Sequence, residues 1–314
     1  MPPIFGSPRV PTVSCLLGAI AVLLMPPAAT AEEASRERAE VRVTPDVVYA
    51  SNSSGELFCD IYSPSCPPQN MLPAVLVIHG GAWSTGSKRL MSGYATQLAQ
   101  CGMVAVSINY HHAPQAKFPT QVDDVRDALI WIRDNAAAYS IDATRIGIFG
   151  YSAGGHLACL AATLQDEPID RLLTTSNWPQ EDPRWQRLPQ VTAVVAGGPP
   201  CEFRNLPVHN GGLAYFLGGT RADLPEVYEA ASPSAFASEG DCPIRFIHGE
   251  RDLIVPIASS QTLYRAQLAA GVPSEFVVIE KQGHMIAFMH PKTSQALLEY
   301  MCRHLNVESD PATP

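Results

Sequence analysis

Short, mostly apolar runs of four to six residues recur along the chain from residue 74 onward. Runs of this length are typical of strands that are covered on both faces of a sheet. The pattern therefore predicts six buried strands. They comprise residues 74–78, 103–108, 146–149, 191–196, 244–247 and 276–279.

Helical periods lie between these predicted strands. Val122, Val125 and Leu129 recur at three- and four-residue steps after Pro119, which places them on one face of a helix. Similar periods run through residues 153–164, 256–270 and 291–305. Strands that alternate with helices predict an α/β fold, a mainly parallel central sheet with helices on both faces. Residues 41–62 alternate between apolar and polar instead, which predicts antiparallel N-terminal strands.

The first 31 residues have the pattern of a signal peptide. Arg9 is their only charged residue, the apolar run at 15–25 is too short to span a bilayer, and they end in Ala-Thr-Ala. We expect cleavage near Ala31 and a secreted or periplasmic protein, with an uncleaved anchor as the alternative. Residues 32–314 are then predicted to form a single domain, because no linker or repeat divides them after residue 40.

The chain is acidic and rich in hydrophobic residues. Its formal net charge is −9, and loss of Arg9 with the signal peptide makes it −10. Proteins that bind nucleic acid or anionic membranes need clustered Lys and Arg side chains, so neither partner is expected. No later stretch reaches the length of a membrane span, which predicts no stable membrane insertion. The composition leaves the oligomeric state open.

Cysteine spacing predicts no metal site. Without Cys15 the eight cysteines fall to seven, an odd number, so at least one is unpaired. None is spaced like the paired ligands of a zinc site. An exported protein tolerates disulfides, and a bond between Cys59 and Cys66 would close a short loop. The sequence leaves that pairing open.

A Gly-Tyr-Ser-Ala-Gly pattern occupies residues 150–154, directly after a predicted strand and at the start of a predicted helix. A G-x-S-x-G turn at such a corner forces its serine into a strained backbone conformation that exposes the hydroxyl group. Ser152 is therefore a candidate nucleophile. The same turn directs the Ala153 N–H and the positive end of the helix toward the place where an oxyanion would form.

Two further residues complete a candidate triad with Ser152. A serine hydroxyl needs an imidazole to accept its proton and an acid to orient that imidazole. Asp252 follows the predicted strand at 244–247, and His284 follows the one at 276–279. Because parallel strands end at the same edge of a sheet, we expect both side chains to lie on the same edge as Ser152.

Four motifs in this order resemble the α/β-hydrolase superfamily. They are His-Gly-Gly-Ala-Trp at 79–83, Gly-Tyr-Ser-Ala-Gly-Gly at 150–155, Asp-Leu-Ile-Val-Pro at 252–256 and Gly-His at 283–284. The chain is similar to secreted esterases and lipases with a bacterial feruloyl esterase-like (BD-FAE) domain, which are related to hormone-sensitive lipase-type carboxylesterases. The resemblance covers about two thirds of the chain and implies the α/β-hydrolase fold.

The resemblance implies roles for the loop at 79–83. Gly81 and Ala82, together with Ala153, would donate backbone N–H groups to an oxyanion. The family usually has glycine at the position of Ala82. His79 is expected to hold the loop, and Trp83 is a candidate substrate contact with plain packing as an equal alternative.

The resemblance also decides between rival acids and bases. Its pattern places the aspartate directly before a stretch such as Leu-Ile-Val-Pro, which favours Asp252 over Glu250. His290 lies beside a proline at a predicted helix start, so His284 is favoured as the base. The family often follows this histidine with glycine and an aromatic residue, where the present chain has Met-Ile-Ala-Phe at 285–288.

The other histidines are predicted to be structural. His156 lies one helical turn after Ser152 and is expected to point away from the corner. His111 and His112 follow a predicted strand without acidic or cysteine partners nearby in the sequence, which indicates a polar loop rather than a metal site.

Two segments interrupt the alternation of strands and helices. Residues 165–190 are polar and carry Trp178 and Trp185, and are predicted to form a surface excursion. Residues 197–238 are rich in Gly, Pro and aromatic residues and lie between two strands on the catalytic side. We expect this second segment to shape a substrate pocket or to form a partial cap.

Taken with the resemblance, these features predict an exported serine hydrolase that acts on carboxylic esters without a cofactor. The expected substrates are short-chain esters or feruloyl and acetyl esters of plant cell walls, either as small molecules or linked to polysaccharide. The alternatives are an arylformamidase-like amide hydrolase, a peptidase and a non-catalytic binding protein on a hydrolase fold. Decayed proteins of the last kind usually lose the serine, the histidine or the oxyanion glycines, all of which this chain keeps.

Overall fold

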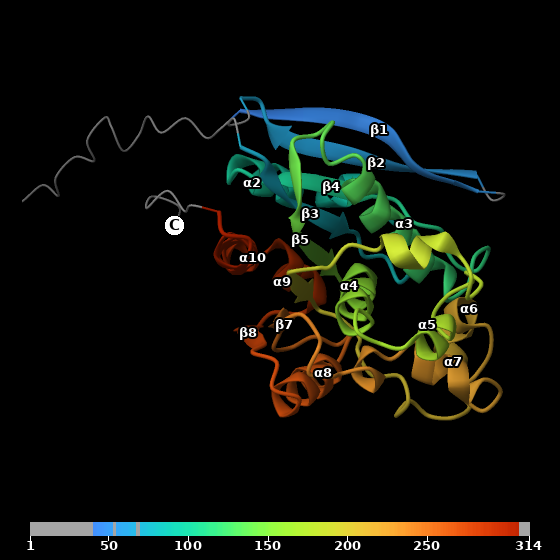
Figure 1. Cartoon of the computed structure of the whole chain (residues 1–314). Coiled ribbons are helices and arrows are strands. Elements are labelled where there is room, and N and C mark those ends of the chain that lie inside the picture. The colour runs from blue at the N-terminus through green and yellow to red at the C-terminus, as the bar shows by residue number, and fades with distance from the viewer. Residues whose placement is uncertain (1–39, 53–54, 67–69, 308–314) are drawn as a thin grey trace, which may run out of the picture. The chain divides into compact units, whose positions relative to one another are not determined.

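The computed structural model describes residues 40–52, 55–66 and 70–307, all within one compact unit, Arg38–Pro314. Among these residues an eight-stranded sheet has the strand order β1-β2-β4-β3-β5-β6-β7-β8 (Figure 1). The strands are β1 (Val41–Asn52), β2 (Gly55–Pro64), β3 (Leu72–Ile78), β4 (Val104–Ile108), β5 (Ile141–Tyr151), β6 (Ala193–Gly197), β7 (Ile244–Gly249) and β8 (Glu275–Ile279).

The strand directions confirm the predicted architecture. β4, β3, β5, β6, β7 and β8 pair in parallel, whereas β1 pairs antiparallel with β2 and β2 pairs antiparallel with β4. The alternating pattern of residues 41–62 therefore does correspond to antiparallel N-terminal strands. Parallel strands require crossover connections, and each of those in this sheet contains at least one helix.

Side chains that alternate along β3 separate the hydrophobic core into two layers. Leu76 and Ile78 belong to the cluster on one face of the sheet, and Val75 and Val77 belong to the cluster on the other. The first layer packs against α3 (Thr120–Asp134), α4 (Ala153–Thr163) and α8 (Ile257–Ala269), and the second against α2 (Ser92–Gln100) and α10 (Pro291–His304). Each central strand is thus covered on both faces.

Shorter helices lie in the connections. They are α5 (Ile169–Leu173), α6 (Ala214–Leu217), α7 (Pro225–Ala230) and α9 (His284–Met289), with 3-10 turns at η1 (Lys88–Met91), η2 (Pro183–Arg187), η3 (Gly211–Leu213) and η4 (Pro233–Ala235). The periods predicted at 153–164, 256–270 and 291–305 correspond to α4, α8 and α10. No helix in the described part of the chain is long and apolar enough to cross a membrane.

The prediction for the last strand was wrong in one respect. Residues 276–279 lie in β8 as expected, but only Ile279 is buried, and Val278 is exposed. β8 is the outermost strand of the sheet, so only one neighbour pairs with it. Its apolar run therefore reflects the packing of a half-covered edge strand rather than burial on both faces.

The predicted signal peptide, residues 1–31, lies outside the described residues. Cleavage near Ala31, export, and the assignment of residues 32–314 to a single domain stay predictions.

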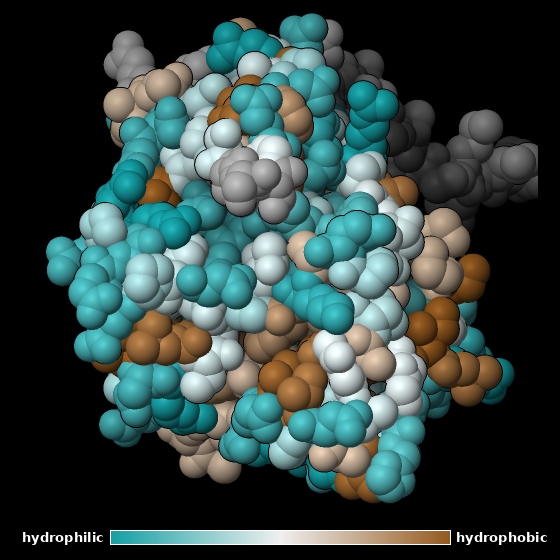
Figure 2. Space-filling model, turned by 90° about the vertical axis from the view of Figure 1, so that its right-hand side faces the viewer, coloured by the Kyte–Doolittle hydropathy of each residue, from teal (hydrophilic) through white to brown (hydrophobic). Residues whose placement is uncertain are grey.

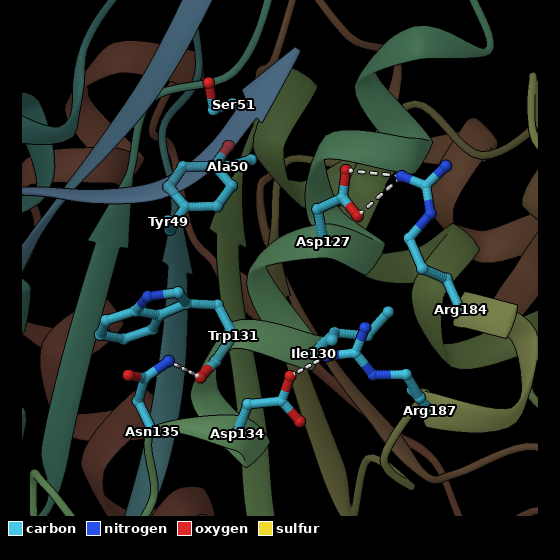
Figure 3. A pocket seen from close by; sticks show the side chains of 10 residues that line it. All are labelled: Tyr49, Ala50, Ser51, Asp127, Ile130, Trp131, Asp134, Asn135, Arg184 and Arg187. Carbon is cyan, nitrogen blue, oxygen red and sulfur yellow. Dashed lines mark hydrogen bonds and ion pairs between the residues drawn. The ribbon is translucent and has the colours of Figure 1, made fainter.

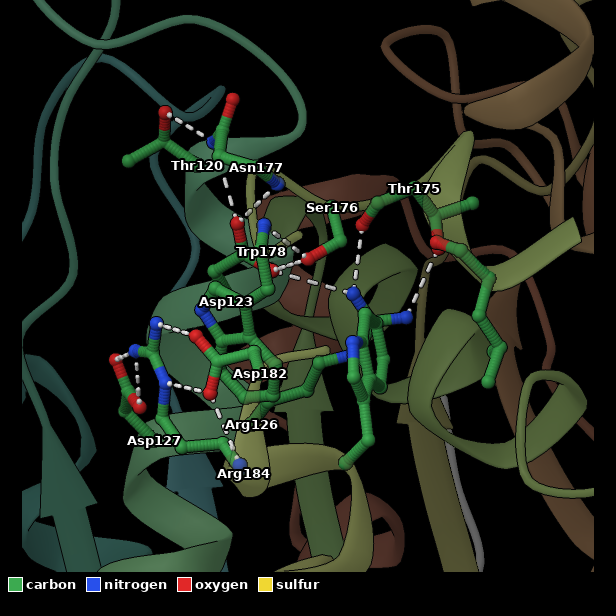
Figure 4. Close-up of polar contacts among 12 residues, drawn as sticks. Thr120, Asp123, Arg126, Asp127, Thr175, Ser176, Asn177, Trp178, Asp182 and Arg184 are labelled. Carbon is green, nitrogen blue, oxygen red and sulfur yellow. Dashed lines mark hydrogen bonds and ion pairs between the residues drawn. The ribbon is translucent and has the colours of Figure 1, made fainter. Parts of the chain in front are cut away.

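A buried polar network fastens the segment 165–190 to α3 (Figure 4). Arg126 donates to Asp123 at 3.2 Å and to the backbone oxygen and hydroxyl of Thr175 at 2.7 and 2.9 Å. Asp123 also accepts from the Ser176 hydroxyl at 2.6 Å and from the Asn177 N–H at 2.7 Å. The predicted surface excursion is therefore tied to the body of the protein through two buried charged side chains.

The substitution Arg126→Met tests this attachment. Removing one partner of a buried ion pair leaves the other charge uncompensated, which costs about 3–5 kcal/mol. We expect urea unfolding to report a loss of that size. Arg133→Met removes a charge from the same helix, but this side chain is 32% exposed and pairs at the surface, so a change of about 1 kcal/mol or less is expected. Equal losses for the two variants would contradict the network's role.

Candidate active site

Ser152 lies at the sharp corner between β5 and α4, in the left-handed region of backbone space, with φ 56° and ψ −119°. Its N–H donates to the Gly197 carbonyl oxygen at 2.7 Å, and its own carbonyl accepts from the His156 N–H at 2.9 Å. A non-glycine residue at positive φ is strained, and the flanking elements hold it there. The side chain is half-buried at the start of the helix.

Close backbone contacts explain the glycines of the motif. A Cβ atom on Gly150 would lie 2.1 Å from the Gly154 carbonyl oxygen, and one on Gly154 would lie 2.2 Å from the Ile78 carbonyl oxygen. Both distances are far below van der Waals contact. Glycine is therefore required on each side of Ser152 so that β3, β5 and α4 can approach one another.

His284 and Asp252 are in direct contact. His284 Nδ1 donates to Asp252 Oδ2 at 2.6 Å, and both side chains are buried. Asp252 Oδ1 accepts from the N–H groups of Ile254 and Val255 at 2.9 Å each. Because a carboxylate only accepts hydrogen bonds, this contact puts the proton on Nδ1 and leaves Nε2 free to act as a base.

Two contacts that the sequence did not indicate position His284. The Tyr151 hydroxyl donates to the His284 carbonyl oxygen at 2.7 Å. Gly198 lies at φ 52°, and a Cβ atom there would be 2.9 Å from His284 Cε1. Tyr151 is the variable residue of the G-x-S-x-G pattern, so the elbow also holds the backbone of the histidine.

The rival acid and base lie elsewhere. Glu250 is exposed and accepts from the Lys281 N–H at 2.6 Å. His290 caps α10, where its Nδ1 accepts from the Lys292 N–H at 3.2 Å. The structure thus pairs His284 with Asp252, the residues that the motif spacing favoured.

The loop after β3 approaches Ser152 closely. A Cβ atom on Gly80 would lie 3.2 Å from Ser152 Cβ. The next three residues, Gly81, Ala82 and Trp83, all have positive φ, at 122°, 50° and 56°. Gly81 has no room for a side chain, because a Cβ atom there would lie 2.0 Å from the Thr85 carbonyl oxygen. Ala153 begins α4, where a helix leaves its first N–H groups without intrahelical acceptors.

Trp83 supports this loop from inside the protein. Its side chain is 4% exposed, its indole stacks on Phe216 at a centroid distance of 4.2 Å, and its Nε1 donates to His156 Nδ1 at 3.2 Å. A side chain with so little free surface offers a substrate almost no contact. The structure therefore favours packing over the substrate contact that the sequence left as an alternative.

The segment 197–238 contacts the loop directly. The Tyr215 hydroxyl donates to the Ala82 carbonyl oxygen at 2.8 Å, and Phe216 provides the surface under Trp83. Phe216 and Tyr228 are among the largest fully buried side chains. Much of this segment is thus part of the core and a support for the loop, and a partial cap stays a prediction.

Two buried histidines are held neutral near the site. Burial lowers the pKa of His79 and of His156 to about 4. His156 Nε2 lies 2.7 Å from the Ala231 carbonyl oxygen, and His79 stacks on Tyr110 at 4.3 Å. Neither imidazole carries a charge at neutral pH, which agrees with their predicted structural roles.

His111 has an acidic partner that sequence analysis missed. Its Nδ1 lies 2.9 Å from Asp124 Oδ1, and this hydrogen bond raises the pKa of His111. Asp124 is thirteen residues away on α3, so sequence proximity could not reveal the pair. Within the described residues, no group of three or more His, Cys, Asp or Glu side chains is arranged to hold a metal ion.

The cysteines of the described residues are all free. Cys59 is buried in β2 while Cys66 is exposed beyond its end, so the structure does not contain the disulfide that the sequence left open. The Sγ atoms of Cys159 and Cys201 lie 3.8 Å apart in the core. Cys159 is a buried residue of α4.

Exposed hydrophobic side chains flank the Asp252–His284 pair. Leu253 and Ile254 are 95% and 67% exposed on the loop that contains Asp252. Met285, Ile286 and Met289 are exposed on α9, which begins at His284. The two segments that supply Asp252 and His284 thus also present apolar side chains to solvent.

Two pockets lie apart from these residues. One of about 280 Å³ lies between β1, α3 and η2, and is lined by Trp131, Asp127, Arg184 and Arg187 among others (Figure 3). A second of about 260 Å³ lies beneath the segment 165–190. The surface in Figure 2 is mainly hydrophilic, with hydrophobic residues in small separate groups. Neither pocket is lined by Ser152, Asp252 or His284.

Comparison with known proteins identifies the family to which this chain belongs. The sequence model of the BD-FAE family matches residues 59–267, which include the loop after β3, the elbow and Asp252. The chain belongs to the BD-FAE family. The match to the BD-FAE model ends before His284.

Relatives of this BD-FAE chain are named as esterases. Esterase LipQ of Mycobacterium tuberculosis is 31% identical over 237 residues, covering 73% of this chain and 53% of the relative. Isoprenylcysteine alpha-carbonyl methylesterase ICME of Arabidopsis thaliana is 27% identical over 258 residues, covering 79% and 58%. The chain thus spans about half the length of the curated relatives it matches.

Solved structures share the fold. A truncated carbohydrate esterase from gut microbiota is 25% identical, with a TM-score of 0.74 over 86% of this chain and 98% of that one. Esterase 2 of Thermogutta terrifontis is 25% identical, with a TM-score of 0.70 over 87% and 95%. That esterase has also been solved in a form phosphoramylated by tabun, with a TM-score of 0.68 over 85% of this chain and 96% of that one. The BD-FAE chain therefore has the α/β-hydrolase fold.

A single added methyl group tests the packing at the elbow. In Gly154→Ala the new Cβ would overlap the Ile78 carbonyl oxygen, and β3 would have to move away from α4. We expect a loss of about 3 kcal/mol or more in the free energy of unfolding, measured in urea. Gly93→Ala adds the same methyl group to α2 where nothing lies within 4 Å, and should stabilise the protein by about 0.5–1 kcal/mol. A Gly154→Ala protein as stable as wild type would contradict the contact.

Proposed function

We propose that the protein is a serine hydrolase of carboxylic esters, with Ser152 as nucleophile, His284 as base and Asp252 as the acid that orients it. The observation that carries the proposal is the 2.6 Å contact between His284 and Asp252 at the same sheet edge as a serine held at φ 56°. A buried aspartate paired with a histidine beside a strained serine is the arrangement that serine hydrolases use.

The proposed reaction has two steps. Ser152 Oγ attacks the acyl carbon as its proton moves to His284 Nε2, and His284 then gives that proton to the departing alcohol as the ester bond breaks. A water molecule, deprotonated by His284, attacks the acyl-serine, and the acid leaves as Ser152 recovers its proton. Asp252 holds Nδ1 throughout and stabilises the imidazolium that forms.

Backbone N–H groups would stabilise the oxyanion in both steps. The proposed donors are Gly81, Ala82 and Ala153, and the approach of Gly80 to Ser152 supports this assignment. Backbone donors need no side chain, so alanine in place of the usual glycine at position 82 is compatible with the role. Each such donor lowers the activation free energy of the reaction by about 3 kcal/mol.

The proposed substrates are esters of small, apolar or aromatic acids, either short-chain esters or the feruloyl and acetyl esters of plant cell walls. The exposed Leu253, Ile254 and Met285 beside the Asp252–His284 pair support an apolar acyl group. A similar structure is a carbohydrate esterase, which supports an ester attached to a sugar. We further propose that the chain acts outside the cytoplasm after removal of residues 1–31.

Ser152→Ala tests the reaction. The variant should fold as wild type but lose about 10⁴-fold or more of the turnover of 4-nitrophenyl acetate, because no other group supplies the nucleophile. A fluorophosphonate probe should label the wild-type protein at Ser152 and leave the variant unlabelled. Glu250→Gln, at the rival acid, is the control and should keep near wild-type turnover. Turnover that survives in folded Ser152→Ala would refute the assignment.

Leu253→Ser tests the apolar acyl site. Each methylene transferred from water to an apolar surface is worth about 0.8 kcal/mol, or about fourfold in binding. We expect the variant to raise KM for 4-nitrophenyl butyrate by about fourfold or more and to leave 4-nitrophenyl acetate almost unchanged. Leu268→Ser, at an exposed leucine on α8, should alter neither. Release of ferulate from methyl ferulate, acetate from acetylated xylan and formate from N-formylkynurenine distinguishes the proposed cell-wall esters from an amide substrate.

A further inference from the structure

A second histidine contacts the carboxylate of Asp252. His248, the next-to-last residue of β7, places Nε2 3.2 Å from Asp252 Oδ2, the oxygen that accepts from His284 Nδ1 at 2.6 Å. Asp252 Oδ1 accepts from two backbone N–H groups, so Oδ2 is the oxygen that lies near both histidines. All three side chains are buried.

The surroundings of His248 fix which nitrogen carries its proton. Nε2 also lies 2.9 Å from the Val255 carbonyl oxygen, and neither that carbonyl nor the Asp252 carboxylate can donate. Nε2 must therefore carry the hydrogen, which is donated to the Val255 carbonyl oxygen while Asp252 Oδ2 lies 3.2 Å from the same nitrogen. Nδ1 is then an acceptor, and the Ser260 hydroxyl at 2.8 Å donates to it. Burial lowers the pKa of His248, so the ring is neutral at neutral pH.

We propose that His248 is a positioning residue, which Ser260 orients and which holds Asp252 Oδ2 in place for His284. This role rests on the proposed function. Ser260, His248, Asp252 and His284 form one chain of polar contacts that runs from α8 through β7 and its loop to α9. The bond from His248 to the Val255 carbonyl fixes the loop that supplies the two N–H groups for Oδ1.

The arrangement has a signature in the pH profile. The titratable groups that face the pair are His248 from β7 and Tyr151 from β5, with Asp252 and His284 themselves. The polar Nε2–H group of His248, whose nitrogen lies 3.2 Å from Asp252 Oδ2, stabilises the negative charge on that oxygen. Without it the carboxylate stabilises the His284 imidazolium more strongly, so the acidic limb of kcat/KM should move to higher pH.

Three variants and one control test the role. His248→Phe keeps a ring but removes the N–H donor. It should lower kcat by roughly 10- to 100-fold and leave KM within about twofold of wild type. The acidic limb of kcat/KM should move to higher pH by about half a unit or more. His248→Gln, whose amide can donate from a similar position, should recover most of kcat and the wild-type limb. Ser260→Ala should show a smaller fall in kcat. Thr262→Ala removes a hydroxyl from the same helix whose partner is only the Ala258 carbonyl, and should behave as wild type.

Rates are expressed per active site, counted by fluorophosphonate labelling of Ser152, so a loss of folded protein does not imitate a loss of kcat. The positioning role would be overturned if labelled His248→Phe had the wild-type kcat and the wild-type acidic limb of kcat/KM. If His248→Phe does not fold, the same result in Ser260→Ala would overturn it. An equal fall in kcat for His248→Phe and His248→Gln, with the acidic limb of the pH profile unchanged, would also overturn the role. His248 would then contribute packing alone. A wild-type protein that neither labels nor hydrolyses esters would refute the proposed function itself, and the two failures are thus distinguishable.

Discussion

The structure depends on how closely three backbone segments meet at the elbow. Ser152 sits in a conformation that costs an L-residue about 1–2 kcal/mol, and it is held there because Gly150 and Gly154 allow β5 and α4 to close around it. The same closeness brings the end of β3 against α4, since Gly154 packs on the Ile78 carbonyl. The loop after β3 therefore starts beside the serine, and its own run of positive φ angles turns it back over the start of the helix.

Burial determines the protonation states of the histidines around the elbow. His79, His156 and His248 are enclosed, their pKa values are lowered, and one nitrogen of each ring contacts a backbone carbonyl oxygen. Asp252 is buried as well, but three donors bond to its two oxygens and His248 Nε2 lies 3.2 Å from one of them, so its negative charge is compensated without a cation. In the proposed enzyme, proton transfer is thereby directed to one imidazole while the others act as fixed hydrogen-bonding groups.

The sequence predicted the central strands, α3, α4, α8 and α10, and the Asp252–His284 pair, because each depends on a local pattern. Apolar runs define strands, and motifs at strand ends converge wherever the sheet is parallel. The remainder depends on contacts between distant residues. The burial of Trp83 is set by Phe216, and the ion pair of His111 by Asp124. Six-residue α9 has no clear helical period, and an apolar run cannot show that β8 is the edge strand.

The stack of Trp83 on Phe216 and the bond from Tyr215 to the Ala82 carbonyl join two segments that lie more than a hundred residues apart. The shape of the 197–238 segment is therefore coupled to the shape of the loop after β3. The two segments form one structural unit. A chimera that exchanges only one of these segments between family members would disrupt the packing of the Trp83 indole on Phe216. A chimera that exchanges both segments would preserve this packing.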